Sequence, residues 1–329
     1  MMTKQRQILR MTIIVWAIAL LCIPGAFAKD DDYPAKPVKI LVPFGPGSAM
    51  DVTSRILSDS LAKELKGNVI VDYKAGGSGM IGSSAVAQSR PDGYTILCGS
   101  IATHIFGPIL SPDKPPYDPV KDFAPIALIG ESPNVLFVSA QSPYKTFEEL
   151  IDYAKKNPGK LNCGTIGVGS AAHFILELIN MNLGTKIVHV PYKEGTGATA
   201  VAVLGGHIDM GIMGASAAIP QVKAGKLKLL IGTGKVADIP GTPTFKEKKL
   251  SQASIGTWIG YFAPAKTPKA VQDKLAAAFA KAVKDPENDN KLEKMGFNVE
   301  YKPAKEFSEM LKTQTETITK AGKAAGLIK

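Results

Sequence analysis

Short apolar runs that alternate with amphipathic stretches are the feature of this chain that most limits its fold. Several of these runs are apolar without interruption, as expected for strands that helices cover on both faces. The runs lie at 38–44, 69–73, 94–100, 134–139, 161–166, 187–192, 208–213 and 227–232. Alternation of such strands with helices predicts an α/β protein with open sheets.

Helix signals stand between and after these runs. The segment 51–66 is predicted to be a helix because one face of it is apolar, with Val52, Ile56, Leu57, Leu61 and Leu65. Thr146 followed by Glu149 is a capping box at the start of a second helix.

The C-terminal third is predicted to be mainly helical. Thr267 before Pro268 predicts a capped helix start, and a last helix is expected over 304–325. The Pro-rich stretch 108–125 and the segment 239–264 are expected to be irregular.

Two separate strand–helix series, 38–100 and 134–232, predict two lobes. We expect lobe 1 to comprise residues 29–133 and 237–329, with the C-terminal helices returning to it. We expect lobe 2 to comprise residues 134–236.

The N-terminus has the three-part layout of a secretory signal peptide. Basic residues precede an apolar run at 11–23, and Ala26, Phe27 and Ala28 form an A-x-A cleavage site. The run is shorter than the roughly 20 residues that a membrane-spanning helix needs. We therefore expect residues 1–28 to be removed and the mature protein to be exported.

Composition excludes several classes of protein. With 45% apolar and 21% charged residues, the chain is an ordinary globular protein and not a disordered chain or a fibre. Its net charge of +10 falls to about +7 without the three basic residues of 1–28, and it forms no basic stripe with aromatic residues, so no nucleic-acid binding is expected. Cys98 and Cys163 fall within strands of different lobes, and we expect both to be buried free thiols.

Open α/β sheets bind ligands at the carboxyl ends of their strands, so the strand-to-helix loops are the candidate site. In lobe 1 the first loop, 43–51, is rich in glycine and precedes a helix, which suits an anion; the alternative is a tight turn capped by Ser48, with Asp51 in the first helical turn. The second contains a G-x-G-x-x-G pattern from Gly77 to Gly82, but no acid ends the following strand, which weakens the dinucleotide interpretation. The candidate ligand-binding residues of lobe 1 are Phe44, Gly47, Ser48, Asp51, Gly77, Ser78, Ser100 and Ile101.

The lobe 2 loops have the same character. The loop 165–173 again joins a strand to a helix, and His173 is either a ligand contact or a packed residue of the first helical turn. Tyr192 lines a cleft or covers a strand end. The candidate residues of lobe 2 are Thr165, Gly169, Ser170, His173, Tyr192, Gly214 and Ala215. Backbone donors are plentiful and catalytic motifs are absent, so we expect neither a catalytic residue, a metal nor a cofactor.

The sequence resembles the Bug-type extracytoplasmic solute receptors, which are the substrate-binding subunits of tripartite tricarboxylate transporters. The matches are spread over almost the whole expected mature chain, 29–329. They are Tyr33–Val38, Val42–Gly47 with Asp51, Pro91–Tyr94, Tyr117–Ile126, Gly167 and Gly169 with His173, His189–Lys193, Gly206–Met210, Pro240–Thr244, and Trp258 with Ala263 and Pro264.

The resemblance implies a periplasmic, two-lobed binding protein of type II, the Venus-flytrap fold, with a ligand cleft between the lobes. It implies reversible binding of a small carboxylated solute, a di- or tricarboxylate or an aromatic acid, through backbone amides and small hydroxyl side chains. Arg55, four residues after Asp51, is expected to pair with it and not with a ligand. Gly214 stands where many relatives have an Asp, which lowers the expectation of an amino-acid ligand.

Three functions remain at this point, two for a solute receptor and one for an enzyme. The first is a monomeric receptor that delivers its solute to membrane transporter subunits. The second is a receptor that reports the solute to a signalling partner, since either partner would recognise the same closed form. The third is an exported hydrolase that uses Ser170 with His173, for which no acid partner is evident.

Overall fold

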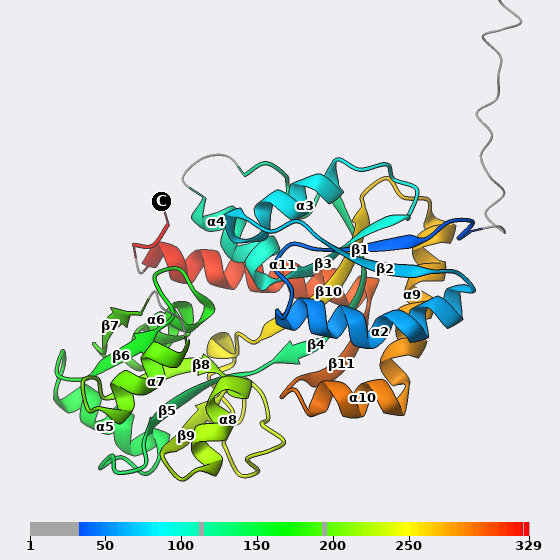
Figure 1. Cartoon of the computed structure of the whole chain (residues 1–329). Helices are drawn as coiled ribbons and strands as arrows, with labels where there is room; N and C mark the ends of the chain where they lie inside the picture. Colours follow the sequence, from blue (N-terminus) through cyan, green and yellow to red (C-terminus); the bar gives the residue numbers. More distant parts are fainter. Residues whose placement is uncertain (1–32, 112–114, 193–195, 325, 329) are drawn as a thin grey trace, which may run out of the picture.

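The structure is a computed structural model that describes residues 33–111, 115–192, 196–324 and 326–328. These residues form two α/β lobes, each built on its own sheet (Figure 1). The predicted signal peptide, 1–28, lies outside the described residues. No helix in the described part of the chain is long and apolar enough to cross a membrane.

The lobe 1 sheet has the strand order β11-β4-β10-β3-β1-β2. Its strands are β1 (Val38–Val42), β2 (Val69–Tyr73), β3 (Thr95–Ser100), β4 (Phe123–Ser132), β10 (Thr257–Pro264) and β11 (Asn298–Pro303). Its helices are α2 (Ala49–Leu65), α3 (Met80–Ala87), α4 (Gly107–Leu110), α9 (Lys269–Lys284) and α10 (Pro286–Glu293), with the short 3-10 helix η2 (Gly77–Gly79) and the short π-helix η3 (Ala102–Phe106).

The lobe 2 sheet has the order β7-β6-β8-β5-β9. Its strands are β5 (Asn134–Ser139), β6 (Asn162–Thr165), β7 (Val188–Pro191), β8 (Met210–Gly214) and β9 (Leu227–Gly232). Its helices are α5 (Phe147–Lys156), α6 (Ala171–Leu183), α7 (Thr196–Leu204) and α8 (Ala215–Lys223). The turn η4 (Ser251–Ala253) contacts α6, and α11 (Ala304–Ala324) contacts both β4 and α6.

Strand directions bring the candidate loops to the edges at which the two sheets face each other. The chain passes from β4 to β5 through Ser132 and Pro133, so the end of β4 and the start of β5 lie at the junction of the lobes. Strand β10 is antiparallel to β4 and to β3, and β1 and β2 run parallel to β3, so β1, β2 and β3 all end at this junction. In lobe 2, β8 is antiparallel to β5, and β6 and β7 run parallel to β8, so these strands end there too.

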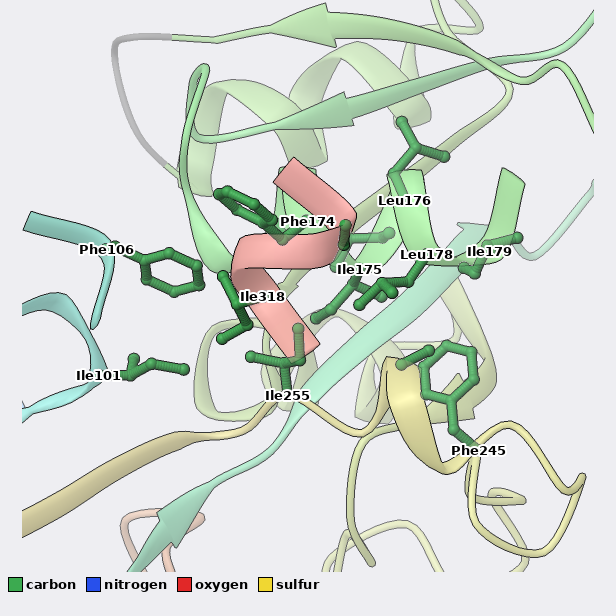
Figure 2. Close-up of a cluster of buried hydrophobic side chains, with 14 of the residues drawn as sticks. Ile101, Phe106, Phe174, Ile175, Leu176, Leu178, Ile179, Phe245, Ile255 and Ile318 are labelled. Carbon is green, nitrogen blue, oxygen red and sulfur yellow. The ribbon is translucent and has the colours of Figure 1, made fainter. Parts of the chain in front are cut away.

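A buried apolar cluster joins the lobes beside this junction (Figure 2). Phe106 of η3 stacks on Phe174 of α6 with ring centroids 4.9 Å apart. Ile318 of α11 and Ile255 belong to the same cluster. The side chain of Asn134 adds a polar link, because its Nδ2 donates to the carbonyl oxygen of Ile255 at 3.0 Å.

Eight predicted strands are confirmed, with ends that shift by at most two residues. β4, β10 and β11 were not predicted. The expectation of irregular structure is wrong for the last residues of 108–125, where β4 begins, and for the last eight of 239–264, which form β10. All three strands pair antiparallel with partners far away in the chain, so their local sequence contains little of the information that stabilises them.

The predicted helix starts differ in outcome. Thr146 Oγ1 accepts from the N–H of Glu149 at 3.2 Å, which confirms the cap, although the Glu149 carboxylate accepts from Lys145 N–H and not from Thr146. The predicted cap by Thr267 is wrong. Helix α9 begins one residue after Pro268, and Thr267 Oγ1 is buried without a hydrogen-bond partner among the described residues.

The predicted lobe boundaries at 133/134 and 236/237 stay predictions. Thr244 pairs with Gly232 at the end of β9, and Phe245 packs edge-on against Phe147 of α5. These contacts favour a second boundary nearer to residue 255.

Candidate ligand-binding site

Three loops of lobe 1 meet at the junction. The loop after β1 exposes Gly45, Pro46 and Gly47 to solvent. At Gly79 (φ +87°) an added Cβ would lie 2.7 Å from Thr103 Cγ2 and 3.1 Å from the ring of Phe44. Because only glycine fits there, the segments that follow β1, β2 and β3 can pack directly on one another.

Asp51 organises the first of these loops from its buried position on α2. Its Oδ2 accepts from the N–H of Gly47 at 2.7 Å, and its own N–H donates to Ser48 Oγ at 3.3 Å. Its Oδ1 accepts from Arg55 Nε at 2.7 Å and from Tyr73 Oη at 2.6 Å. The predicted Asp51–Arg55 ion pair is therefore confirmed, and the carboxylate is bonded within its own lobe.

These bonds keep Asp51 ionised. Burial by itself raises the pKa of Asp51, but the hydrogen bonds from Tyr73, Gly47 and Arg55 outweigh it and hold that pKa below its usual value. The negative charge is balanced by the Arg55 guanidinium, so the loop as a whole does not repel an anion.

His173 has the corresponding place in lobe 2. Its Nδ1 accepts from the N–H of Gly169 at 3.1 Å, and its own N–H donates to Ser170 Oγ at 3.2 Å. The side chain is only 6% exposed. Its Nε2 lies 3.5 Å from Glu177 Oε1. Ser170 Oγ donates to the carbonyl oxygen of Gly167 at 2.8 Å and not to the imidazole, so the two side chains are not arranged as nucleophile and base.

A second imidazole supports the same loop. The ring of His189, on β7, stacks on that of His173 with centroids 3.7 Å apart and an interplanar angle of 13°. Its Nε2 is 2.6 Å from Thr165 Oγ1, which also accepts from the N–H of Gly167 at 3.2 Å. Burial, together with the neighbouring His173, lowers the pKa of His189 to about 4, so this ring is neutral at physiological pH.

Several backbone N–H groups in the candidate loops make no hydrogen bond within the described part of the chain, including those of the predicted residues Gly77 and Ser78. Within the described residues, the N–H groups of Ala49 and Met50 at the start of α2 make no hydrogen bond, and neither do those of Val168, Ala171 and Ala172 around the start of α6. Unpaired N–H groups at a helix start attract an anion, helped by the helix dipole. Each lobe thus presents such a group of donors at the junction.

A family comparison agrees with this arrangement. The sequence profile described as the tripartite tricarboxylate transporter family receptor matches residues 53–327. The chain belongs to this family. It is a family of solute-binding receptors, not of enzymes, and the predicted resemblance and two-lobed fold are confirmed.

Individual relatives cover nearly the whole chain. Protein BugT of Bordetella pertussis is 32% identical over 80% of this chain and 82% of its own length. A solute-binding protein of the family from Polaromonas, solved without ligand, superposes with a TM-score of 0.78, at 28% identity, over 88% of this chain and 98% of its own. An R. palustris protein solved with adipate has a TM-score of 0.72, at 27% identity, over 90% of this chain and 99% of its own.

The other predicted residues of this family member are spread over both lobes. Gly77 and Ser78 are exposed in η2, and Ser100 and Ile101 are each 2% exposed. Ile101 faces the buried cluster that joins the lobes (Figure 2). The G-x-G-x-x-G pattern has a packing explanation at its last position, because a Cβ on Gly82 would lie 2.5 Å from the carbonyl oxygen of Lys74.

In lobe 2, Tyr192 is half-buried, and its N–H donates to the carbonyl oxygen of Thr165 at 2.8 Å, which brings the loops after β6 and β7 together. Gly214 pairs with Asn134, and the N–H of Ala215 donates to the carbonyl oxygen of Pro133 at 2.8 Å, so both lie at the junction of the lobes. The direct ligand contacts of the fifteen predicted residues stay predictions. Cys98 and Cys163 are free and buried, as predicted.

Proposed function

We propose that this protein is a periplasmic solute receptor. It reversibly binds a small carboxylated organic solute between its lobes and delivers it to the membrane subunits of a tripartite tricarboxylate-type transporter. The observation that supports this most is the matched pair of helix starts, at Ala49 and Ala171, whose unpaired N–H groups lie on facing edges of the two sheets.

The chemistry of these loops favours a carboxylate. Backbone N–H groups at a helix start are fixed donors that need no reorganisation when an anion arrives. Donors from both lobes acting on one solute would favour the closed form of a hinged protein. The neighbour that was solved with adipate supports an acid of this size.

The first experiment measures thermal stability of the chain from Lys29 with adipate, malate, succinate, citrate and benzoate. An acid present at 100 times its Kd should add about 2.7 kcal/mol to the unfolding free energy. The uncharged diamide of adipic acid is the control and should add nothing. If no acid of the panel raises the melting temperature, the proposal is wrong.

Two proline substitutions then test the donors themselves. Ala49 and Ala171 occupy the first helical position, where proline removes the N–H without straining the helix. The preceding residues Ser48 and Ser170 already have the extended conformation that proline requires of its neighbour. Ala49→Pro and Ala171→Pro should each weaken binding by about tenfold or more at unchanged melting temperature, as expected for a lost hydrogen bond to a charged group.

Delivery is tested separately from binding. Uptake of the labelled acid should be lost in cells that lack the receptor and be restored by the wild-type chain, but not by the double variant Ala49→Pro/Ala171→Pro. Restoration by the double variant would show that transport does not depend on this site.

A further inference from the structure

The loops after β1 and β6 share one local arrangement, which we call the reciprocal cap. In each, a serine N-cap accepts from the N–H three residues later, and the side chain of that later residue accepts from the glycine before the serine. The two glycines have φ values of +83° and +77°, and the two serines have φ, ψ values of −67°, 155° and −73°, 160°. The returning bonds are Gly47 N to Asp51 Oδ2 and Gly169 N to His173 Nδ1.

The acceptor in lobe 2 is an imidazole nitrogen. A ring nitrogen that accepts a hydrogen bond carries no proton, so the His173 proton is on Nε2, which points to Glu177. Thr165 Oγ1, supported by His189, receives the N–H of Gly167. The N–H groups of Gly167 and Gly169 are therefore both turned into the protein, and that of Val168 between them is left unpaired.

The hydrogen bond from Gly169 N–H to His173 Nδ1 matters for two reasons. Glycine populates several backbone conformations at similar energy, so the φ of +77° must be selected by contacts. The space over it is also tight, since an added Cβ would lie 2.6 Å from Leu110 Cδ1 of lobe 1. The bond to His173 is the contact that selects the conformation from the lobe 2 side.

We propose that His173 is a positioning residue for ligand binding. It does not touch the solute; it holds Gly169 so that the N–H groups of Val168, Ala171 and Ala172 stay free for a carboxylate. This inference rests on the proposed function.

The residues four positions later explain why this acceptor is not a carboxylate. In lobe 1 the Asp51 carboxylate is followed by Arg55, which pairs with it, whereas in lobe 2 His173 is followed by Glu177. An Asp at position 173 would place a second carboxylate next to that of Glu177. Both negative charges would lie close to the N–H groups that are proposed to bind an anion. The neutral imidazole accepts the same hydrogen bond without that repulsion.

Four variants separate these requirements, and all of them remove the stacking on His189. His173→Asn keeps a neutral acceptor. Its side chain is as long as that of Asp51, which reaches the corresponding glycine N–H in lobe 1. His173→Leu removes the acceptor. His173→Asp keeps the acceptor but adds a charge, and the double variant His173→Asp/Glu177→Arg rebuilds the charge arrangement of lobe 1.

The affinity for adipate is measured by calorimetry alongside the melting temperature. His173→Asn should bind within about threefold of the wild type, and His173→Leu about tenfold or more weakly, the factor that about 1.4 kcal/mol produces. His173→Asp should be weak and the double variant should recover most of the affinity. Equal affinities of His173→Leu and His173→Asn, at equal melting temperatures, would overturn the proposal.

Hydrogen exchange of the Gly169 amide, followed by NMR, tests the positioning without any solute. Exchange should be slow in the wild type and His173→Asn, and at least tenfold faster in His173→Leu. An unchanged rate in His173→Leu overturns the inference whether or not adipate binds. Fast exchange in His173→Leu, with no binding of any panel acid by the wild type, would instead support the positioning role and reject the proposed function.

Discussion

The loop after β1 and the loop after β6 have the same backbone shape over opposite side-chain chemistry. One rests on a carboxylate with a guanidinium four residues later, and the other on an imidazole with a carboxylate four residues later. Both acceptors receive the N–H of a glycine that has a positive φ. The difference shows that this loop geometry requires an acceptor at one position of the first helical turn, and that the charge of this acceptor is matched to the residue four positions later.

The two loops also differ in what lies behind them. Helix α2 packs on α9 and on the core of its own lobe, with Leu57 fully buried there. Helix α6 packs on α11 and places Phe174 against Phe106 of lobe 1 (Figure 2). The lobe 2 loop is therefore supported by elements that join the lobes, and the lobe 1 loop by one lobe alone.

The largest expected effect is at Phe174, the α6 side chain that packs against Phe106 of lobe 1. Phe174→Ala should lower the unfolding free energy by about 3–5 kcal/mol, because the side chain is fully buried and leaves a cavity. Leu57→Ala, the matched change in α2, should cost about 2–5 kcal/mol. Urea unfolding measures both. Only Phe174→Ala should also change the radius of gyration in X-ray scattering, and an equal change for Leu57→Ala would contradict the comparison.

The next effect concerns Glu131, which lies on β4 where the lobes join. A Cβ on Gly256 would lie 2.2 Å from its Oε2 and one on Gly234 would lie 3.0 Å from its Oε1. Burial first, and then the nearby Glu300, raise the pKa of Glu131 to about 7, although Lys302 lowers it in part. The folded state thus binds more protons than the unfolded state between about pH 4.5 and 7, and stability falls as pH rises through this range.

Glu131→Gln should remove that dependence. At pH 8 the variant should be more stable than the wild type by about 2 kcal/mol, less than the full pKa shift implies because the side chain keeps some exposure to solvent. At pH 4 the two should be equal. Urea unfolding at both pH values checks this, and a wild type whose stability does not fall between pH 5 and 7 would refute it.

A smaller effect is expected at the lobe 1 acceptor. Asp51→Ala leaves the Gly47 N–H without its acceptor and should cost about 1–2 kcal/mol of unfolding free energy. Asp51→Asn keeps an acceptor and should cost less than half of this. Because the pKa of Asp51 is lowered on folding, its contribution is present above the pKa of the unfolded state and is lost as pH falls through the folded value. Equal losses in the two variants would mean that the charge, and not the acceptor, supports this loop.

The smallest expected effect is at the two thiols, one in each lobe. Burial raises the pKa of Cys98 to about 12 and also raises that of Cys163. Neither thiol of the chain from Lys29 should react with a disulfide reagent at pH 8 until the protein is unfolded. Labelling of one thiol in the native protein would show that its lobe opens more readily than the other.

Local interactions were predictable from the sequence. Ser48, Thr146 and the Asp51–Arg55 pair act within one helical turn, so their spacing in the chain is enough to place them. The position of the candidate loops was also predictable, since strand ends in α/β sheets follow from the alternating pattern. The Thr267 prediction failed because the helix start shifted by one residue and the hydroxyl was buried instead.

Which individual N–H groups of these loops stay unpaired was not predictable in the same way. The sequence patterns pointed to Gly169, Ser170 and His173, whose N–H groups and side chains turn out to be bonded within the loop. Among the unpaired N–H groups are those of Ala49 and Ala171, which lie at the predicted helix starts but were not named as ligand contacts. The stack of His173 on His189 joins two residues 16 positions apart and depends on the pairing of β6 with β7.

The sequence by itself determined the periodic pattern, the family, the two strand–helix series and the cap at Thr146, because these depend on interactions between residues near one another in the chain or on similarity of the whole chain. Only the tertiary structure decided that Trp258 pairs with Glu131 across β10 and β4, that α11 bridges the lobes, and that two unrelated side chains hold matching loops. These contacts join residues that are distant in sequence, and their free energy is gained only when the sheets are assembled.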